Sequence, residues 1–345
     1  MKKETLDIRY EMLDVKSSSY FNSLISILIS IYLISQVCNA QQTPTYTQFV
    51  LNQYGANPAY AGTNLGMEAT TGRRYQWLGF ANAPVTTFGS FTFAWRGGGD
   101  YNYKSKQAVG FYVEDDRAGA FSSKSAYLSY SYHIKIFTGL NIAAGIFAGI
   151  RQVGLANNIY DPNDPALNNH IPNTSLITIP DIIPGMRFYT KKLFIDISVR
   201  QLYQNKLQDG NREIGSPPSK LAPTYTFIAK RKIPLGDNTW MLVPAVKVQS
   251  AFTTIPLIEA NAMLFYNRTV GVGASVRGNS FACAIFQIKI LKNIIVGFGY
   301  DYTINKLHTA AANSVEFMLS FTPGGFGDDK NAGNRKVANC PDFNF

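Results

Sequence analysis

The sequence predicts an all-β fold: a transmembrane antiparallel β-barrel of the outer-membrane type, with about fourteen strands. The first observation is length, since residues 67–321 divide into segments of about nine to eleven residues, which suits strands tilted across a bilayer. The second is the alternation of apolar and polar residues with period two inside these segments. The third is that only residues 21–37 are uniformly apolar, which excludes a bundle of membrane-spanning helices.

The chain opens with a predicted signal peptide, residues 1–40. Basic residues precede the apolar stretch, and the small residues Cys38 and Ala40 provide a signal-peptidase site before Gln41. The alternative is an uncleaved signal anchor, but serines interrupt the stretch and a full span needs about twenty apolar residues. We therefore expect an exported protein that loses this leader.

Residues 41–66 form the next expected segment, ahead of the first strand. Proline fixes its own φ and disfavours the helical region for the residue before it, so Asn57-Pro58 predicts a turn. The aromatic residues of this segment need burial, either beneath the barrel in the periplasm or inside its lumen. The sequence leaves both placements open.

Residues 67–321 are expected to form the barrel, and the parity of each segment assigns a lipid face and a water face. Within 193–200, for example, apolar odd positions alternate with Asp196, Ser198 and Arg200. Backbone amides have no water partner in hydrocarbon, so the strands must pair all the way round. The fourteen strand candidates begin near Met67, Val85, Lys106, Lys124, Gly139, Ile182, Lys192, Leu221, Thr239, Leu257, Arg268, Ser280, Lys292 and Asn313.

Connection lengths orient this predicted barrel. An even number of strands places both ends of the barrel in the periplasm, where turns are short, while external loops are long. The two longest connections, 152–181 and 201–220, then lie outside. Residues 322–345, rich in Gly, Asn and Asp, are expected to form a periplasmic C-terminal tail. The tight periplasmic turns fall at 190–192, 266–268 and 291–293.

Ionisable residues at membrane depth must face water or one another, so the polar positions of the strands predict an interior network. That network is either structural or the lining of a narrow conduit. The lumen positions are Asp196, Ser198, Arg200, Glu259, Asn261, Arg277 and Asp301.

No catalytic, cofactor or metal site is expected, and the chain is predicted not to be an enzyme. His133, His170 and His308 lie on a strand and two loops, so they assemble no Ser/His/Asp set. The loop from Asp161 to Pro165 offers oxygens, but its prolines and its spacing favour a turn over a calcium site.

The formal net charge of +10 gathers at the expected periplasmic ends of the strands. These residues are either solvated turn residues near lipid headgroups or a basic rim that docks an acidic periplasmic partner by long-range attraction. Nucleic acid is not an expected partner of an exported barrel. The proposed rim consists of Lys104, Lys135, Lys191, Lys192, Lys230, Arg231, Lys232, Arg268 and Lys292.

Several short motifs, taken together with their spacing, resemble the PorP/SprF family of outer-membrane proteins from the type IX secretion and gliding system of Bacteroidetes. Each fragment is weak alone, and their order over nearly the whole mature chain carries the resemblance. The motif residues are Asn57, Pro58, Ala59, Tyr60, Ala61, Gly62, Gln76, Trp77, Pro84, Asp116, Gly119, Asp161, Pro162, Asp164 and Pro165.

This resemblance implies an outer-membrane barrel that works with the periplasmic ring proteins PorK and PorN and with a PorE-like peptidoglycan-binding protein. In the SprF type, it implies export or surface attachment of a partner adhesin that carries a type B C-terminal domain. The alternative function is an outer-membrane porin or hydrophobic-solute transporter that is independent of protein secretion. Neither function needs chemistry from the chain itself.

Overall fold

The computed structural model describes residues 43–96, 105–137, 139–155, 176–206, 208–209, 212–213, 220–236, 239–252, 255–291, 293–304 and 313–323. The chain divides into two units, and the unit Gln42–Ala251 with Pro256–Phe345 contains every strand. Of the other unit, only Phe252 and Ile255 are described. Among the described residues, no helix is long and apolar enough to cross a membrane.

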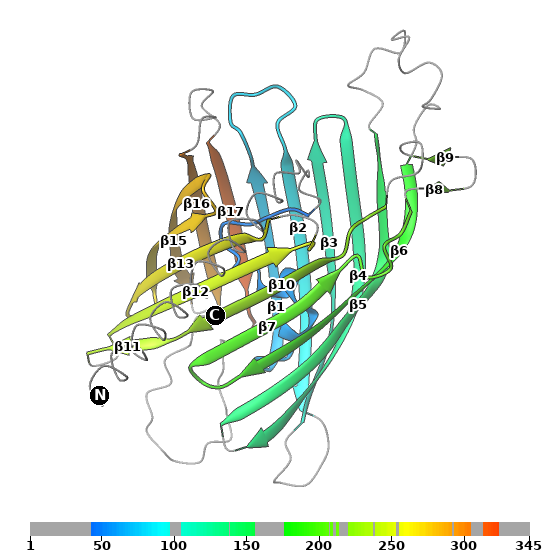
Figure 1. Ribbon diagram of the computed structural model, residues 1–345. Coiled ribbons are helices and arrows are strands. Elements are labelled where there is room, and N and C mark those ends of the chain that lie inside the picture. The colour runs from blue at the N-terminus through cyan, green and yellow to red at the C-terminus, as the bar shows by residue number, and fades with distance from the viewer. Residues whose placement is uncertain are drawn as a thin grey trace, which may run out of the picture. The chain divides into compact units, whose positions relative to one another are not determined.

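Within the described residues, fourteen antiparallel strands close into a barrel, which confirms the predicted fold class (Figure 1). Each strand pairs with its neighbours along the chain, and the pairing of the first and last strands closes the ring. The strands are β1 (Gly66–Tyr75), β2 (Val85–Arg96), β3 (Lys106–Ala118), β4 (Phe121–Phe137), β5 (Leu140–Leu155), β6 (Leu176–Tyr189), β7 (Leu193–Arg200), β10 (Thr224–Arg231), β12 (Trp240–Ser250), β13 (Leu257–Tyr266), β14 (Val270–Arg277), β15 (Phe281–Leu291), β16 (Ile294–Thr303) and β17 (Ser314–Phe321).

Three further strands are short. β11 (Ile233–Leu235) continues the direction of β10 and pairs with the start of β12. β8 (Gln208–Asp209) and β9 (Arg212–Glu213) form a separate two-stranded ladder in the connection between β7 and β10. None of these adds a member to the ring.

The alternation predicted from the sequence is confirmed on β7. Asp196, Ser198 and Arg200 are buried toward the lumen, while Leu193 and Ile197 are exposed on the outer face. An apolar outer face exposed in this way is what a strand in contact with lipid requires.

Two strands begin earlier than predicted. β4 begins at Phe121 rather than near Lys124, and β6 begins at Leu176 rather than near Ile182. The sequence interpretation had assigned residues up to 181, including Pro180, to the external connection 152–181, and proline is normally excluded from a central strand. Here β6 pairs with β7 only over Gly185–Tyr189, so the prolines at 180 and 184 lie beyond that ladder. Because prolines 180 and 184 have no partner on β7, their missing N–H groups remove no hydrogen bond between β6 and β7.

The barrel has two ends that differ in their connections. We call the end where β1 begins and β17 ends the terminal end, and the opposite end the loop end. β5 and β7 end at the loop end, and β6 and β10 begin there, as the predicted alternation requires. The tight turn at 190–192, between β6 and β7, lies at the terminal end.

Candidate functional site

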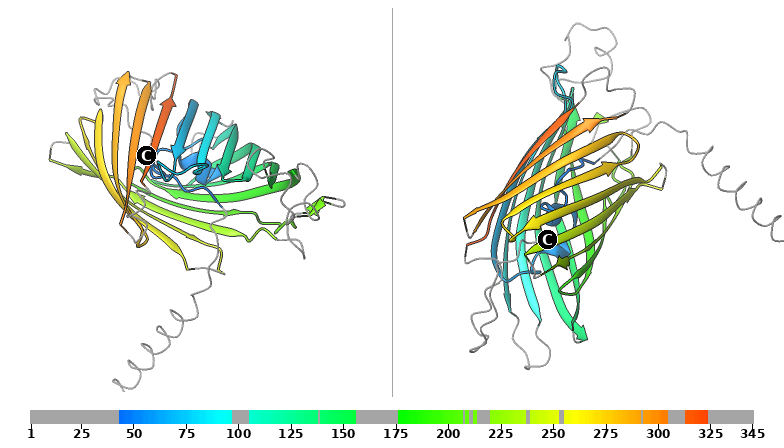
Figure 2. Two further views of the ribbon diagram at one scale, coloured as in Figure 1. Left: turned by 90° about the horizontal axis from the view of Figure 1, so that it is seen from above. Right: turned by 90° about the vertical axis from the view of Figure 1, so that its left-hand side faces the viewer.

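The lumen of the barrel is occupied by the segment Thr43–Thr63, which we call the plug (Figure 2). It runs from the loop-end half of the lumen to the terminal end and then leads into β1. Its two helical turns are α2 (Gln53–Ala56) and η1 (Pro58–Tyr60). Asn52 caps the first by accepting from Gly55 N, and Asn57 caps the second by accepting from Ala59 N at 2.9 Å. Asn57-Pro58 therefore begins a 3-10 turn inside the barrel.

Toward the loop end, the plug is anchored through Thr47 and Gln48. Both carboxylate oxygens of Glu316 accept backbone amides, from Thr47 N at 2.8 Å and from Gln48 N at 2.9 Å. The Thr47 hydroxyl donates to Asp301 at 2.6 Å and accepts from Arg74 at 2.7 Å. The backbone donors of an irregular segment are thus satisfied by strand side chains, as burial away from water demands.

Six charged side chains around Thr47 form the loop-end cluster, which balances three positive with three negative charges. Arg74 pairs with Asp301 at 2.6 Å, and Arg277 pairs with Glu259 at 3.1 Å. Removing one member from such a dry network leaves its partner unpaired at high cost. The members are Arg74, Lys247, Glu259, Arg277, Asp301 and Glu316.

Between the two ends of the lumen, the plug packs on the wall through aromatic rings. Tyr46 lies edge-on to Phe88 with ring centroids 5.0 Å apart, and Tyr54 packs in the same way on Phe147 at 4.9 Å. Their hydroxyls are paired as well, since Tyr46 donates to Glu114 at 2.9 Å and the Tyr54 hydroxyl lies 2.5 Å from Ser129 Oγ. This part of the lumen is a packed core with satisfied polar ends.

Toward the terminal end, the plug meets a second charged group, the terminal-end cluster of Arg187, Asp196 and Lys230. Arg187 donates two hydrogen bonds to the carboxylate of Asp196, of 2.6 and 2.8 Å. The same guanidinium donates to Gln53 at 2.8 Å, and Lys230 also donates to that amide oxygen. Asn57 Nδ2 donates to Asp196 at 2.9 Å. The motif asparagine is therefore tied to the wall by the same carboxylate that pairs with Arg187.

The last plug residues are held where the chain turns into β1. The Ala61 carbonyl accepts from Ser131 Oγ at 2.5 Å and lies 2.5 Å from His133 Nε2. Gly62 follows with φ +88°, a conformation that favours glycine. The first and last residues of the motif Asn57–Gly62 therefore each have a structural role: Asn57 bonds to Asp196, and Gly62 adopts a positive φ.

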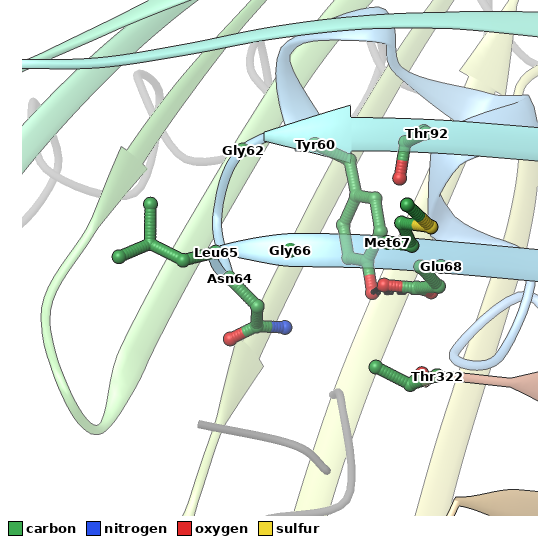
Figure 3. A pocket seen from close by; sticks show the side chains of 9 residues that line it. All are labelled: Tyr60, Gly62, Asn64, Leu65, Gly66, Met67, Glu68, Thr92 and Thr322. Carbon is green, nitrogen blue, oxygen red and sulfur yellow. Dashed lines mark hydrogen bonds between the residues drawn. The ribbon is translucent and has the colours of Figure 1, made fainter. Parts of the chain in front are cut away.

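Tyr60 completes this region, beside a small pocket shared with β1 and β2 (Figure 3). Its hydroxyl donates to Glu68 at 2.9 Å, and the guanidinium of Arg187 lies 4.8 Å from the centre of its ring. The plug is fixed to the strand that it precedes as well as to the far wall.

Glycines on the wall make room for the plug. A Cβ added at Gly145 would lie 2.5 Å from Ala59 N and 2.7 Å from Ala59 Cα, both of them backbone atoms. We expect Gly145→Val to destabilise the folded barrel by roughly 1–3 kcal/mol, because backbone inside the lumen has little room to move. Urea unfolding in detergent micelles, followed by the heat-dependent shift in gel mobility, measures this change.

The matched control is Gly89→Val. Gly89 faces outward on β2, and the atom nearest to its added Cβ is Val113 Cγ2 at 3.5 Å. We expect little change there. If Gly145→Val and Gly89→Val lowered the free energy of unfolding equally, a tight fit between the plug and the wall would be contradicted.

Plug residues and inward wall side chains form one buried cluster over the described residues. Phe147, Val243, Phe265 and Ile295 point inward from different strands and are all 0% exposed. Within the described ranges, no group of three or more His, Cys, Asp or Glu residues is placed to hold a metal ion.

The remaining motif residues fall in two groups. Gln76, Trp77, Pro84, Asp116 and Gly119 meet at the loop end, where Gln76 N donates to Pro84 O at 2.9 Å and Thr86 Oγ1 donates to Asp116 at 2.6 Å. The loop residues Asp161, Pro162, Asp164 and Pro165 lie outside the described residues.

The predicted basic rim needs one correction. Lys135, Lys191, Lys192 and Arg231 are exposed at the terminal end, and Lys232 and Arg268 are partly exposed. Lys230 was wrongly included, because its side chain is 3% exposed and points into the lumen. It shares the inward parity of Thr224, Thr226 and Ile228 on β10. Lys104 and Lys292 lie outside the described residues.

All seven lumen positions predicted from the sequence are buried. The prediction missed their partners, although strand parity contained the signal. Arg74, for example, alternates with the outward residues Arg73 and Tyr75 on β1, and this parity places it inside. Apart from Lys230, the other buried charged residues that it missed are Glu114, Arg151, Asp181, Arg187, Lys247, Lys289 and Glu316.

A family model described as "Type IX secretion system membrane protein PorP/SprF" matches residues 38–321. A search of curated proteins finds no relative of this chain. Among solved structures, the outer membrane protein Omp33 of Acinetobacter baumannii is similar with a TM-score of 0.45 and 9% identity, covering 76% of this chain and 99% of that one. The toluene transporter TodX of P. putida is similar with a TM-score of 0.42 and 9% identity, covering 81% and 94%.

Proposed function

This chain belongs to the PorP/SprF family of type IX secretion system membrane proteins, and we propose that it acts as a plugged, non-enzymatic binding component of that machinery. The filled lumen is the observation that carries the proposal. Inward residues of the described strands are buried against the plug, which suits a support better than a conduit. A porin or hydrophobic-solute transporter would need a path through the same space.

We infer further that the terminal end faces the periplasm and the loop end faces outside. This follows the usual arrangement of short periplasmic turns and long external loops. The periplasmic partners are then the ring proteins PorK and PorN and a PorE-like peptidoglycan-binding protein, and the external client is an adhesin with a type B C-terminal domain. The leader 1–40 directs export, residues 41–66 supply the plug, and residues 322–345 form a periplasmic tail.

The test of the function is deletion of the chain in its own cell. We expect secreted and surface-bound cargo to fall by at least roughly tenfold, because the proposal makes the interfaces of this chain necessary for export and display. Cargo in the medium and on the cell surface is quantified by mass spectrometry. Normal secretion together with normal surface display would reject the proposal.

The exposed basic residues of the terminal end supply a surface for an acidic partner. Lys191 and Lys192 lie in the turn after β6. Arg231 ends β10 and Lys232 follows it, and Lys232 N donates to Lys192 O at 2.7 Å. Four positive charges are therefore gathered on two adjacent connections. Such a group raises the association rate of an oppositely charged protein, and salt weakens the effect.

We expect the combined substitutions Lys191→Glu, Lys192→Glu, Arg231→Glu and Lys232→Glu to lower co-purification of the ring proteins roughly tenfold or more, because attraction becomes repulsion. Affinity purification from native membranes at two salt concentrations measures it. The control carries Arg117→Glu and Lys124→Glu, which change charges at the loop end. Undiminished recovery of the ring with the rim variant would refute the docking role.

A further inference from the structure

The connection between β1 and β2, residues 76–84, is a short ordered loop held from two sides. Leu78 N donates to Asn313 O at 2.8 Å, which ties it to the residue before β17. On the other side, Gly119 N in the turn after β3 donates to Asn82 O at 3.0 Å. We call this connection the Trp77 loop. Its backbone is anchored to both neighbouring hairpins.

The conformation of this loop is one that its sequence disfavours. Trp77 has φ +51°, in the left-handed region that bulky side chains rarely adopt, and Trp77 N donates to Ser314 Oγ at 3.3 Å. Strain of this kind persists only where surrounding bonds impose it, and it is concentrated at functional positions. The surrounding bonds here hold one geometry at the loop end.

That geometry presents apolar side chains to solvent. Trp77 is 39% exposed, Leu78 41% and Phe80 47%. None of these three side chains belongs to the buried core of the lumen. A rigid loop tipped with a tryptophan and two apolar neighbours has the composition of an energetic centre in a protein interface, and its rigidity lowers the entropy cost of binding.

Toward β2–β6, lipid is a poor occupant for this tip, because polar side chains separate it there from the apolar outer wall. Toward β17, the outward residue paired with Arg73 is the apolar Phe317. A row of outward residues, one on each strand from β1 to β6, is directly paired from strand to strand. The next outward row toward the terminal end holds Gly89, Val113 and Ala126 on β2–β4. The polar row is Arg73, Thr87, Asp115, Lys124, Gln152 and Thr178.

We propose that Trp77, Leu78 and Phe80 are the docking point for an apolar surface of the protein client at the loop end. This deepens the proposed function and rests on it, since it names the part of the barrel that meets the client. The flanking charges Asp115 and Arg117 neutralise each other in an exposed ion pair of 2.9 Å. The tip is therefore selective for an apolar partner rather than for a charged one.

The first experiment separates protein from lipid. Two variants retain a single tryptophan, either Trp77 or the outward Trp240, with the other tryptophans changed to Phe. Both are reconstituted in vesicles of brominated phosphatidylcholine. We expect Trp240 fluorescence to be quenched and Trp77 fluorescence to be nearly unchanged. Equal quenching of the two would place the tip in lipid and overturn the proposal.

The second experiment measures client display with full-length protein in intact cells. We expect the triple variant Trp77→Ser, Leu78→Ser, Phe80→Ser to reach wild-type membrane levels and to retain the periplasmic ring, yet to lower surface-bound cargo at least tenfold. The control, Leu202→Ser with Tyr203→Ser, changes two exposed apolar residues of another loop and should leave cargo unchanged.

The outcomes distinguish the two proposals. If deletion of the whole chain lowers cargo and the triple variant does not, the docking point is wrong and the secretion role stands. If deletion itself leaves cargo unchanged, both fall. Loss of cargo in the control as severe as in the triple variant would also reject a role specific to the Trp77 loop.

Discussion

Replacing residues 43–60 with a Gly/Ser segment of equal length is expected to turn a closed barrel into a conducting one. The plug fills the lumen and contributes buried rings to its core, among them Tyr46, Phe49 and Tyr54. A Gly/Ser chain cannot bury enough apolar surface to stay ordered there, so water and ions would enter. Purified protein in planar bilayers should show steady conductance in the variant and no steady open state in the wild type.

The same replacement removes many wall contacts, so folding must be measured alongside conductance. A heat-dependent gel shift reports whether the variant still forms a barrel. As a second approach, Tyr54→Ala keeps the chain length and removes one ring that packs on Phe147, and it should produce brief openings. A steady pore in wild-type protein, equal to that of the variant, would contradict the closed lumen and favour the transporter alternative.

How far the sequence anticipated this lumen depends on periodicity. On β7, alternation alone placed Asp196, Ser198 and Arg200 inside, because a strand has only two faces and lipid excludes charge from one of them. The same rule would have placed Arg187 and Lys230. Lys230 was instead assigned to the rim, since a lysine next to Arg231 near a strand end looks like a solvated turn residue.

Strand alternation could not place the plug, because the sequence of the plug follows no period-two pattern. Its position depends on partners far along the chain: Glu316 binds the amides of Thr47 and Gln48, and Asp196 binds Asn57. A turn at Asn57-Pro58 was predictable from local chemistry, whereas its docking against β6 and β7 was not. The Trp77 loop is a similar case, since its geometry comes from bonds to Asn313 and Gly119.

The largest single-residue effect is expected at Arg187. This guanidinium is 0% exposed, pairs twice with Asp196, and reaches both Gln53 and Thr63 of the plug. Arg187→Met fills a similar volume but leaves a buried carboxylate without its cation. We expect a loss of about 3–5 kcal/mol in the free energy of unfolding, the usual cost of breaking a buried pair from one side. Urea titration in detergent micelles measures it.

A double-mutant cycle separates this pairing from the other contacts of Arg187. Adding Asp196→Asn to Arg187→Met removes the unpaired charge and keeps an acceptor for Asn57 Nδ2, so the double variant should recover part of the loss, giving a coupling energy of about 1–3 kcal/mol. The control is Arg117→Met, which breaks an exposed pair with Asp115 and should cost less than about 1 kcal/mol. If the two single arginine variants lost equal stability, the terminal-end cluster would not be what anchors the plug, because burial is the main difference between the two pairs.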